Sequence, residues 1–532
     1  MHKINARYFP SGGPTRIEED NSAIIPLVDG EEYFNAVRME IGRAQSPGDA
    51  IYMLGWRFEA DFRFNKSSND PSELGTVLAS KAATGVDVRI IMPTKWQLLD
   101  WLQKETEKEL RDRNNNDLNN LLNWFGPKGN ILHTDLLRKK TIGRDSPLSS
   151  RILLDYSGEL FGTHHQKMVL ILRGGAAVGF VAGIDFLADR LDSRRHDEKL
   201  PRPYSTNQKD TIKYYWHDAG ARVEGPVVKS LFYFFNARWS YCLTLSDRAF
   251  KFKDGQTIPS LNPRVEMTSP RGKAQSTPLS STTPLKGVYL AANFPERDVK
   301  GSNPAFHEPH GMFARPSIHT TGELYKKAIG SARKYIYIED QYFSAQSMEG
   351  VLLEAARRSV KIIAVIGGFS DDEGKSVDPR LSSPFLKSLG NDKVAVMQVK
   401  DTIVHSKLMI IDDEFVAIGS ANFTDRSFIE AEDKGGGADS AMRDFLRDVK
   451  QAWSTDSELT VAAVDDRRND LNVAMRLRIL LWAEHLRVSA EDQVIWRQLS
   501  DLEVGLSIFN KSWGRPVSFD HGNSRLLHVE IV

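Results

Sequence analysis

The sequence has little cysteine, no excess charge of either sign and no long apolar run. The single cysteine, Cys242, excludes an intramolecular disulfide and a cysteine-based zinc cluster. Lys plus Arg equals Asp plus Glu at 70 each, so no large basic field for nucleic acid is expected. No stretch of about eighteen apolar residues occurs, and the N-terminus lacks the apolar core of a signal peptide. We therefore expect a soluble, cytoplasmic protein, with export by a leaderless route as an alternative.

What the sequence does contain is a repeated order of elements within a composition typical of globular proteins. A buried-strand pattern at 50–56 precedes a helical stretch and a second strand at 86–92. A similar strand at 335–341 precedes a helix-like segment at 350–358 and a strand at 360–366. Strands that alternate with helices predict two similar α/β sandwich domains, each with a mixed β-sheet flanked by helices.

Composition also predicts the limits of these two halves. The segment 251–301 is rich in Pro, Ser and Thr and is predicted to be a flexible linker between an N-terminal half, 1–250, and a C-terminal half, 302–532. Two further stretches, 102–123 and 430–452, have the composition of insertions. Each either shapes access to a site or decorates the surface.

The second half carries a short motif suited to phosphate chemistry. His405-Ser406-Lys407 leads into an apolar run that ends at Asp412, and a turn of small residues follows and ends at Asn422. On a strand, His405 and Lys407 point to the same side. The lysine can neutralise phosphate oxygens, Asn422 can donate a further hydrogen bond, and the histidine can move a proton or attack phosphorus.

The first half repeats this pattern. His164-His165-Gln166-Lys167 begins an apolar strand, and a small-residue turn follows at 182–185. A single His-x-Lys pair is usually a satisfied surface pair, but two copies on apolar strands, each followed by such a turn, indicate one site built from both halves. The other histidines form no ligand pattern such as H-E-x-x-H, so neither a metal nor another cofactor is expected.

The two motifs resemble those of the phospholipase D superfamily, whose signature is a duplicated H-x-K-x4-D followed by G-S/G-x-N/D. The resemblance implies two halves packed pseudo-symmetrically around one active site at their interface. Further segments resemble motifs of the lipid-cleaving branch: 216–218, 223–226, 336–343, 456–459 and 481–486. One departure is Leu172, which stands where the first motif has Asp. Since that Asp supports a loop in the family, we expect an active first site with an altered hairpin; a degenerate first half is the alternative.

The resemblance also implies a mechanism. His165 would attack phosphorus to give a phosphohistidine and His405 would serve as acid and base, although the physics allows the reverse assignment. The family pattern pairs Asp218 with His165 and Glu458 with His405; without the resemblance, the two carboxylates could equally be surface ion-pair or turn residues.

The remaining pocket residues follow from the same resemblance. Lys167 and Lys407 would hold the phosphate oxygens, which removes the need for a metal. Asn422 joins the catalytic group, and further residues are expected to bind substrate: His164, Asp185, Ser420, Gln341 and Trp56.

The leading functional hypothesis is hydrolysis of glycerophospholipids to phosphatidic acid and a free head group, with transphosphatidylation of alcohols as a side activity. The partner is then a membrane surface, which the protein contacts peripherally, as an intracellular enzyme or as an exported antibacterial or host-directed effector. Candidate membrane contacts are Trp56, Tyr342, Phe343 and 138–140, whereas 231–235 is predicted to be a buried helix face. A nuclease, a phosphatidyltransferase such as a cardiolipin synthase, and a non-catalytic lipid-binding module are the alternatives.

Overall fold

The computed structural model describes most of the chain outside several loops. The described residues are 3–11, 17–18, 22–56, 58, 62–64, 73–93, 151–155, 164–174, 176–196, 215–245, 285–294, 318–367, 393–399, 402–428, 456–468, 472–509 and 526–528. Both predicted insertions, the basic run 138–140 and the linker up to residue 284 lie outside them. Within the described residues, no helix combines the length and the apolar character needed to cross a membrane.

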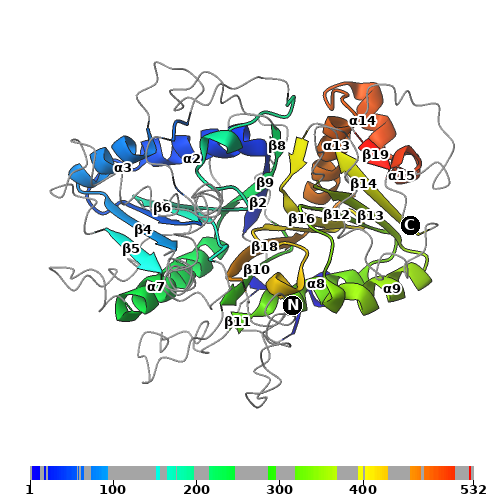
Figure 1. Cartoon of the computed structure of the whole chain (residues 1–532), viewed down its shortest axis with the longest axis horizontal. Helices are drawn as coiled ribbons and strands as arrows, with labels where there is room; N and C mark the ends of the chain where they lie inside the picture. The colour runs from blue at the N-terminus through cyan, green and yellow to red at the C-terminus, as the bar shows by residue number, and fades with distance from the viewer. Residues whose placement is uncertain are drawn as a thin grey trace, which may run out of the picture.

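The first half is a mixed sheet between two helical layers. Among the described residues, its seven strands run in the order β2-β9-β7-β6-β3-β4-β5, with β3, β4 and β5 parallel to one another and the remaining pairs antiparallel. Helices α2 and α3 cover one face and α7 covers the other (Figure 1). The bounds are β2 (Ala23–Val28), β3 (Ala50–Leu54), β4 (Asp87–Pro93), β5 (Ile152–Asp155), β6 (Met168–Arg173), β7 (Ala176–Ala182), β9 (Ala219–Glu224), α2 (Asp29–Arg43), α3 (Leu74–Ala83) and α7 (Val227–Leu245).

The second half repeats this strand order and extends it. Strands β10-β18-β17-β16-β12-β13-β14 correspond one to one to the first sheet, and β1, β11 and β19 are added at the edges. Helices α8 and α9 cover one face, and α13, α14 and α15 the other (Figure 1). The bounds are β1 (Ile17–Glu18), β10 (Gly287–Phe294), β11 (Ile318–His319), β12 (Tyr335–Asp340), β13 (Lys361–Ile366), β14 (Val394–Val399), β16 (Lys407–Ile411), β17 (Phe415–Gly419), β18 (Glu458–Val464), β19 (Leu526–His528), α8 (Thr320–Ser331), α9 (Glu349–Arg357), α13 (Val473–His485), α14 (Gln493–Ser500) and α15 (Leu502–Phe509).

The prediction of two similar α/β domains with mixed sheets is therefore confirmed. Strand β3 consists of apolar and aromatic residues, β12 begins with four such residues and ends with Glu339 and Asp340, and both strands are buried along their whole length because helices cover both faces of each sheet. The apolar run 231–235 lies in α7, where Leu231 and Phe235 are fully buried, as predicted. Phe343 is also buried and stacks on Phe423, so its prediction as a membrane contact is wrong.

The two halves share one hydrophobic core. A single cluster of buried residues runs from α7 and the first sheet to α13 and the second sheet, for example from Phe235 through Val181 to Leu459 and Trp482. A two-stranded ribbon also joins the halves: β8 (Tyr215–His217) from the first pairs in parallel with β15 (Thr402–Val404) from the second. The halves are thus fixed to each other by packing and by backbone hydrogen bonds.

The predicted domain limits need two corrections. The predicted linker 251–301 contains β10, which pairs with β18 in the second sheet, so the linker is shorter than composition suggested. The N-terminal helix α1 (Lys3–Tyr8) belongs with the second half. Its Arg7 contacts Asp412, and its Tyr8 stacks on Phe415. Composition could not reveal either point, because both depend on contacts between residues far apart in the chain.

Candidate active site

The structure brings the two His-x-Lys motifs together between the sheets. His165 and Lys167 lie directly before β6, which begins at Met168. Lys407 is the first residue of β16, and Ser406 separates it from His405. All four side chains are buried. The Nζ of Lys167 donates a hydrogen bond to the carbonyl of His165 at 2.8 Å, and Lys407 does the same to His405. Each ammonium is therefore fixed beside its own imidazole, with further N–H groups left for an anion.

Each histidine is paired with a carboxylate, but the pairing is the opposite of the predicted one. The Nδ1 of His165 lies 3.1 Å from both oxygens of Glu458, and the Nδ1 of His405 lies 2.7 Å from Asp218 Oδ2. The prediction that Asp218 serves His165 and Glu458 serves His405 is wrong. Each pair instead combines one residue from each half.

Strand pairing explains this exchange. Because β8 pairs in parallel with β15, His217 lies opposite Val404. The next residue along each strand direction is Asp218 in the first half and His405 in the second, so these two residues lie side by side. The backbone N–H of His405 donates to the carbonyl of His217 at 2.7 Å. The backbone N–H of His165 likewise donates to the carbonyl of Ser457, the residue before Glu458, at 3.0 Å. Each carboxylate is thus delivered to the histidine of the other half.

Burial sets the ionisation of these pairs. It lowers the pKa of His165 well below its usual value, and Lys167 and Lys407 lower it further. The pKa of His405 is lowered by burial and then by Lys407 in the same way. Both imidazoles are therefore neutral at pH 7 in the unliganded site, as a nucleophile requires.

The two carboxylates shift in the other direction. Burial raises the pKa of Asp218 to about 7, against the effect of Lys407. Burial also raises the pKa of Glu458 to about 7, against the hydrogen bond from Ser420 and the charge of Lys167. Each carboxylate faces Nδ1, so the Nε2 of each imidazole is the atom available to substrate.

Several other predicted residues also lie at this site. Asp185 Oδ2 is 3.6 Å from Lys167 Nζ, and its Oδ1 accepts a hydrogen bond from the backbone N–H of Trp56. Asn422 is buried, and its Oδ1 has no hydrogen-bond partner among the described residues, so its amide group can meet a ligand. Gln341 directly follows β12, at the end of that strand nearest the site, and is partly exposed.

Two predicted substrate contacts serve other purposes. Ser420 is fully buried and its hydroxyl donates to Glu458, so it acts through that carboxylate and does not reach substrate. Ser427 in α11 (Asp425–Phe428) donates to the other oxygen of Glu458 at 2.8 Å. The ring of His164 lies 3.1 Å from Arg238 Nη2 of α7, which turns this histidine toward the helix.

Aromatic rings flank both histidines, and one of them was not predicted. The ring of Trp56 lies edge-on to His165 with the centroids 6.3 Å apart, and that of Trp216 lies edge-on to His405 at 5.2 Å. The guanidinium of Arg190, at the end of η3 (Ala188–Arg190), is 3.1 Å from the ring centroid of Trp216. Trp216 could have been inferred from its place beside His217-Asp218, whereas no pattern in the sequence distinguishes Arg190.

The missing Asp of the first motif is replaced from elsewhere. In the second half, Asp412 accepts hydrogen bonds from the backbone N–H groups of 333–335, at the start of β12. In the first half, Asp49 does the corresponding work: it accepts from the N–H groups of Gln45 and Ser46, before β3, and from that of Gly174 in the β6–β7 hairpin. The first half therefore keeps the hydrogen-bonded link between this loop and the hairpin, but its carboxylate belongs to the loop, whereas that of the second half belongs to the hairpin.

Among the described residues, the groups of His, Asp and Glu side chains close enough to hold a metal ion include neither His165 nor His405. They lie behind His405, around His217. The dyads themselves supply imidazole, carboxylate and ammonium groups, which suit proton transfer and nucleophilic attack on a phosphodiester.

Comparison with known proteins agrees with this chemistry. Residues 45–365 match the family described as Phospholipase D, and residues 325–435 match the one described as Cardiolipin synthase, PLD-like domain. Phospholipase D alpha 1 of Arabidopsis thaliana is 25% identical over 517 residues, which cover 77% of this chain and 61% of the relative. Phospholipase D alpha 1 of Oryza sativa subsp. japonica is 22% identical over 570 residues, covering 87% and 65%. The chain thus spans about three-fifths of the length of these relatives.

Among solved structures, the phosphatidylserine synthase of Haemophilus influenzae Rd KW20 has a TM-score of 0.46 and 12% identity, with 86% of each chain covered. The family match over 45–365 extends across more than half of the sequence and includes the first His-x-Lys motif. The chain belongs to the phospholipase D superfamily.

Proposed function

We propose that this protein is a phospholipase D that hydrolyses the distal phosphodiester of glycerophospholipids and releases phosphatidic acid and a free head group. The observation that carries the proposal is the pair of crossed His–carboxylate dyads, His165–Glu458 and His405–Asp218, with a lysine beside each histidine. Such a site offers one nucleophile, one acid–base group and two cations to a single phosphate.

In the proposed reaction, Nε2 of His165 attacks phosphorus. A P–N bond forms, the bond from phosphorus to the head-group oxygen breaks, and that oxygen takes a proton from Nε2 of His405. Water then gives a proton to His405 and attacks phosphorus, the P–N bond breaks, and phosphatidic acid leaves. The superfamily resemblance favours His165 as nucleophile.

Substrate binding would allow His405 to take up from solvent the proton that it needs as an acid. The positive charges of Lys167 and Lys407 help to keep the pKa of His405 low in the empty site. An anionic phosphodiester between these lysines opposes their effect, so His405 gains affinity for a proton when substrate is bound. The lysines then stabilise the charge on the phosphate oxygens as the bonds change.

The aromatic rings favour transfer to alcohols beside hydrolysis. Trp56 and Trp216 each lie edge-on to one of the histidines, so the space around each reacting Nε2 is partly apolar. A phosphohistidine in such surroundings is accessible to small alcohols as well as to water. We propose transphosphatidylation as the side activity, with the protein working peripherally at a membrane surface.

The proposal is tested with purified protein in the presence of a chelator. Phosphatidylcholine and phosphatidylethanolamine vesicles, and separately single- and double-stranded DNA, are incubated with wild type, His165→Ala and His405→Ala. We expect wild type to release phosphatidic acid, and to form a phosphatidyl-alcohol when a primary alcohol is added, while both variants lose at least about 10³-fold in rate. Cleavage of DNA without cleavage of lipid would support a nuclease and contradict the proposal.

A further inference from the structure

A second cluster of buried chemical groups lies directly behind His405. Asp29 begins α2, His196 follows η3, His217 ends β8, and Glu484 belongs to α13. All four are buried, and one donor atom of each lies within 4.8 Å of the donor atoms of the others. Three come from the first half and Glu484 comes from the second, so the cluster is formed only when the halves are packed together.

The two imidazoles are held in the orientation that metal ligands adopt. The Nε2 of His217 lies 2.8 Å from Glu339 Oε2, and the Nδ1 of His196 lies 2.7 Å from Asp192 Oδ2. Histidines that bind metals usually donate their other ring N–H to a carboxylate in this way. Nδ1 of His217 and Nε2 of His196 are the ring nitrogens left to bind a metal, and both face the carboxylates of the cluster.

The spacing of the donor atoms, with both oxygens of Asp29 considered, falls around the value for tetrahedral coordination. His217 Nδ1 is 2.6 Å from Glu484 Oε1 and 3.1 Å from Asp29 Oδ1, and His196 Nε2 is 3.1 Å from Glu484 Oε1 and 3.7 Å from Asp29 Oδ2. Ligands about 2.0 Å from a tetrahedral zinc ion lie about 3.3 Å from each other. The four distances bracket this value.

Two carboxylate oxygens of the cluster lack the hydrogen bonds expected of buried groups. Asp29 Oδ2 and Glu484 Oε2 are buried and accept no hydrogen bond among the described residues, whereas Nδ1 of His217 contacts the other oxygen of each carboxylate. Buried polar atoms are usually satisfied, so two unsatisfied oxygens in one cluster point to an unseen ligand. Two nitrogens and two carboxylates suit a divalent cation.

We propose that Asp29, His196, His217 and Glu484 bind one structural Zn²⁺ ion. Imidazole nitrogens favour zinc over calcium or magnesium, and four protein ligands complete a tetrahedral shell with no position left for substrate. The ion takes no part in the reaction at the dyads. This inference is independent of the proposed function.

The ion would hold one catalytic pair in place. The backbone N–H of Asp29 donates to the carbonyl of Asp218 at 2.8 Å, and Asp29 Oδ1 accepts from the N–H of Asp218 at 3.0 Å. The carbonyl of His217 accepts from the N–H of His405. Two of the four ligands are therefore bonded directly to the backbone of the His405–Asp218 dyad, so the ion fixes that dyad as well as the two halves.

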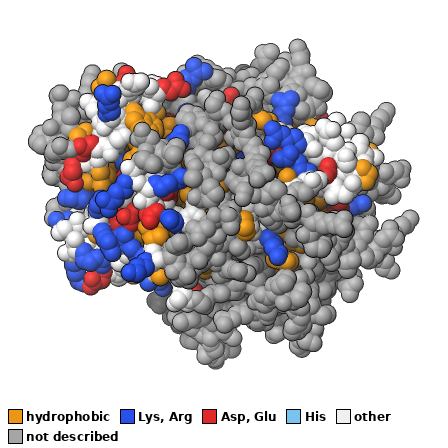
Figure 2. Space-filling model, turned by 180° about the vertical axis from the view of Figure 1, so that it is seen from behind, with side chains coloured by type: hydrophobic (Ala, Val, Ile, Leu, Met, Phe, Trp, Pro, Cys, Tyr) orange, Lys and Arg blue, Asp and Glu red, His pale blue; other side chains and the backbone are white. Residues whose placement is uncertain are grey.

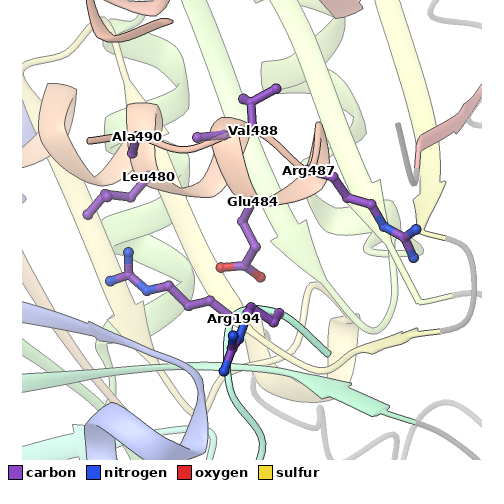
Figure 3. Close-up of a pocket in the computed structure, with 8 residues that line it drawn as sticks. Arg194, Leu480, Glu484, Arg487, Val488 and Ala490 are labelled. Atoms are coloured by element: carbon purple, nitrogen blue, oxygen red, sulfur yellow. The ribbon is translucent and has the colours of Figure 1, made fainter. Parts of the chain in front are cut away.

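Glu484 also connects the cluster with a pocket of about 420 Å³ (Figure 3). Arg194, Arg195 and Arg487 line this pocket together with apolar residues of and after α13. The positive charges of these lining arginines oppose the entry of a cation through the pocket, so we expect zinc to bind during folding and to exchange slowly afterwards. The protein should therefore be loaded while it is made.

The test is the metal content of the full-length protein from cells grown with added Zn²⁺, measured by inductively coupled plasma mass spectrometry. We expect about one zinc per chain in wild type, retained after dialysis against a chelator, and less than about a fifth of that in His196→Gln and Glu484→Gln. His485→Gln is the matched control. His485 is buried and contacts Glu339, but it lies outside the proposed ligand set, so this variant should keep its zinc.

A second measurement does not depend on variants that fold. Wild type made in Co²⁺-supplemented minimal medium should show the intense visible absorption of tetrahedral Co²⁺ with nitrogen and oxygen ligands. Wild type without a bound divalent metal, or His196→Gln with a full zinc content, would overturn the proposal, and the cluster would then be held by protons alone. Both readouts are independent of lipid hydrolysis, so failure of the proposed function leaves them unaffected.

Discussion

At the scale of single residues, the two dyads have the same design but different supports. Glu458 receives hydroxyl hydrogen bonds from Ser420 and Ser427, whereas Asp218 receives the backbone N–H of Ala219. Both carboxylates face Nδ1 of an imidazole and so fix its tautomer. The protein therefore positions each Nε2 by burying a carboxylate from the other half behind it.

Glu458→Gln tests the crossed pairing directly. The amide keeps the size of the side chain but removes the negative charge that orients His165 and stabilises its positive form. We expect kcat for lipid hydrolysis to fall by about 10²- to 10⁴-fold with little change in KM. Glu354→Gln is the control, because Glu354 in α9 has 60% of its side chain exposed. A Glu458→Gln enzyme with wild-type kcat would contradict the role given to this carboxylate.

The alkaline side of the pH profile should report Lys407. Burial lowers the pKa of Lys407 to about 8, although Asp218 and Asp340 oppose that effect. The charged ammonium is present below this pH and is lost as the pH rises through it. We therefore expect kcat/KM to fall about tenfold per pH unit above about pH 8.

Lys407→Arg should remove that alkaline fall, since a guanidinium stays charged throughout the range, even if the overall rate is lower. The measurement is log kcat/KM against pH for both proteins. A wild-type profile that stays level to about pH 10 would show that Lys407 keeps its proton or is not needed for the reaction.

At the scale of elements, the β6–β7 hairpin shows how the first half works without the usual Asp. Leu172 lies in β6 opposite Ala50 of β3 and belongs to the shared hydrophobic core. A carboxylate there would be buried among apolar side chains. Asp49 supplies the missing hydrogen bonds from the loop before β3, which frees position 172 for packing.

Asp49→Ala should therefore destabilise the first half. It leaves three backbone N–H groups without their acceptor, and we expect a loss of about 2 kcal/mol in the free energy of unfolding, measured in urea. Asp466→Ala, at an exposed position, should change it by less than about 0.5 kcal/mol. Adding Leu172→Asp to Asp49→Ala should lower stability further; rescue by this second change would refute the proposed replacement.

The elements themselves were largely predictable, while their pairings were not. The alternation of β3 and β12 with helices follows from local hydrophobic patterns, and so does the buried face of α7. The exchange of carboxylates depends on the pairing of β8 with β15, whose residues are about 190 positions apart. The strand β10 was not predicted because it lies in a segment that is otherwise rich in Pro, Ser and Thr.

The cluster behind His405 was also beyond sequence analysis, for the same physical reason. Asp29, His196, His217 and Glu484 have no regular spacing and are brought together only by the packing of α2 and α13 against the β8 ribbon. His217 and Glu484 each lie in a segment that resembles a family motif, but the sequence does not indicate that the two side chains meet in space. The spacing of residues in the sequence can identify a set of metal ligands only when those ligands lie on one helix, strand or loop.

At the scale of the whole molecule, the two halves are one functional unit. Each dyad contains residues of both, the hydrophobic core is continuous between them, and the ribbon of β8 with β15 links their backbones. Neither half alone contains both residues of either dyad. The proposed activity would therefore require the two halves to be packed together.

Charge on the same scale bears on the choice of substrate. The chain has equal numbers of acidic and basic residues, and Figure 2 shows Lys and Arg with Asp and Glu between them on the back of the molecule. Exposed cations such as Lys334, in the loop between α8 and β12, and Arg358, directly after α9, lie just before the parallel strands β12 and β13. They are therefore at the opposite end of the sheet from the dyads.

Salt should accordingly have little effect on hydrolysis of a zwitterionic lipid. We expect the rate on phosphatidylcholine vesicles to change by less than about threefold between 50 and 200 mM NaCl, because these cations lie away from the dyads and a single head-group phosphate releases few counterions. A substrate held by 6 to 10 phosphate contacts would lose roughly 10³- to 10⁵-fold over the same range. Initial rates at a fixed lipid concentration distinguish the two cases, and a steep decline would mean that an extended polyanion, not a single head-group phosphate, is what the site binds.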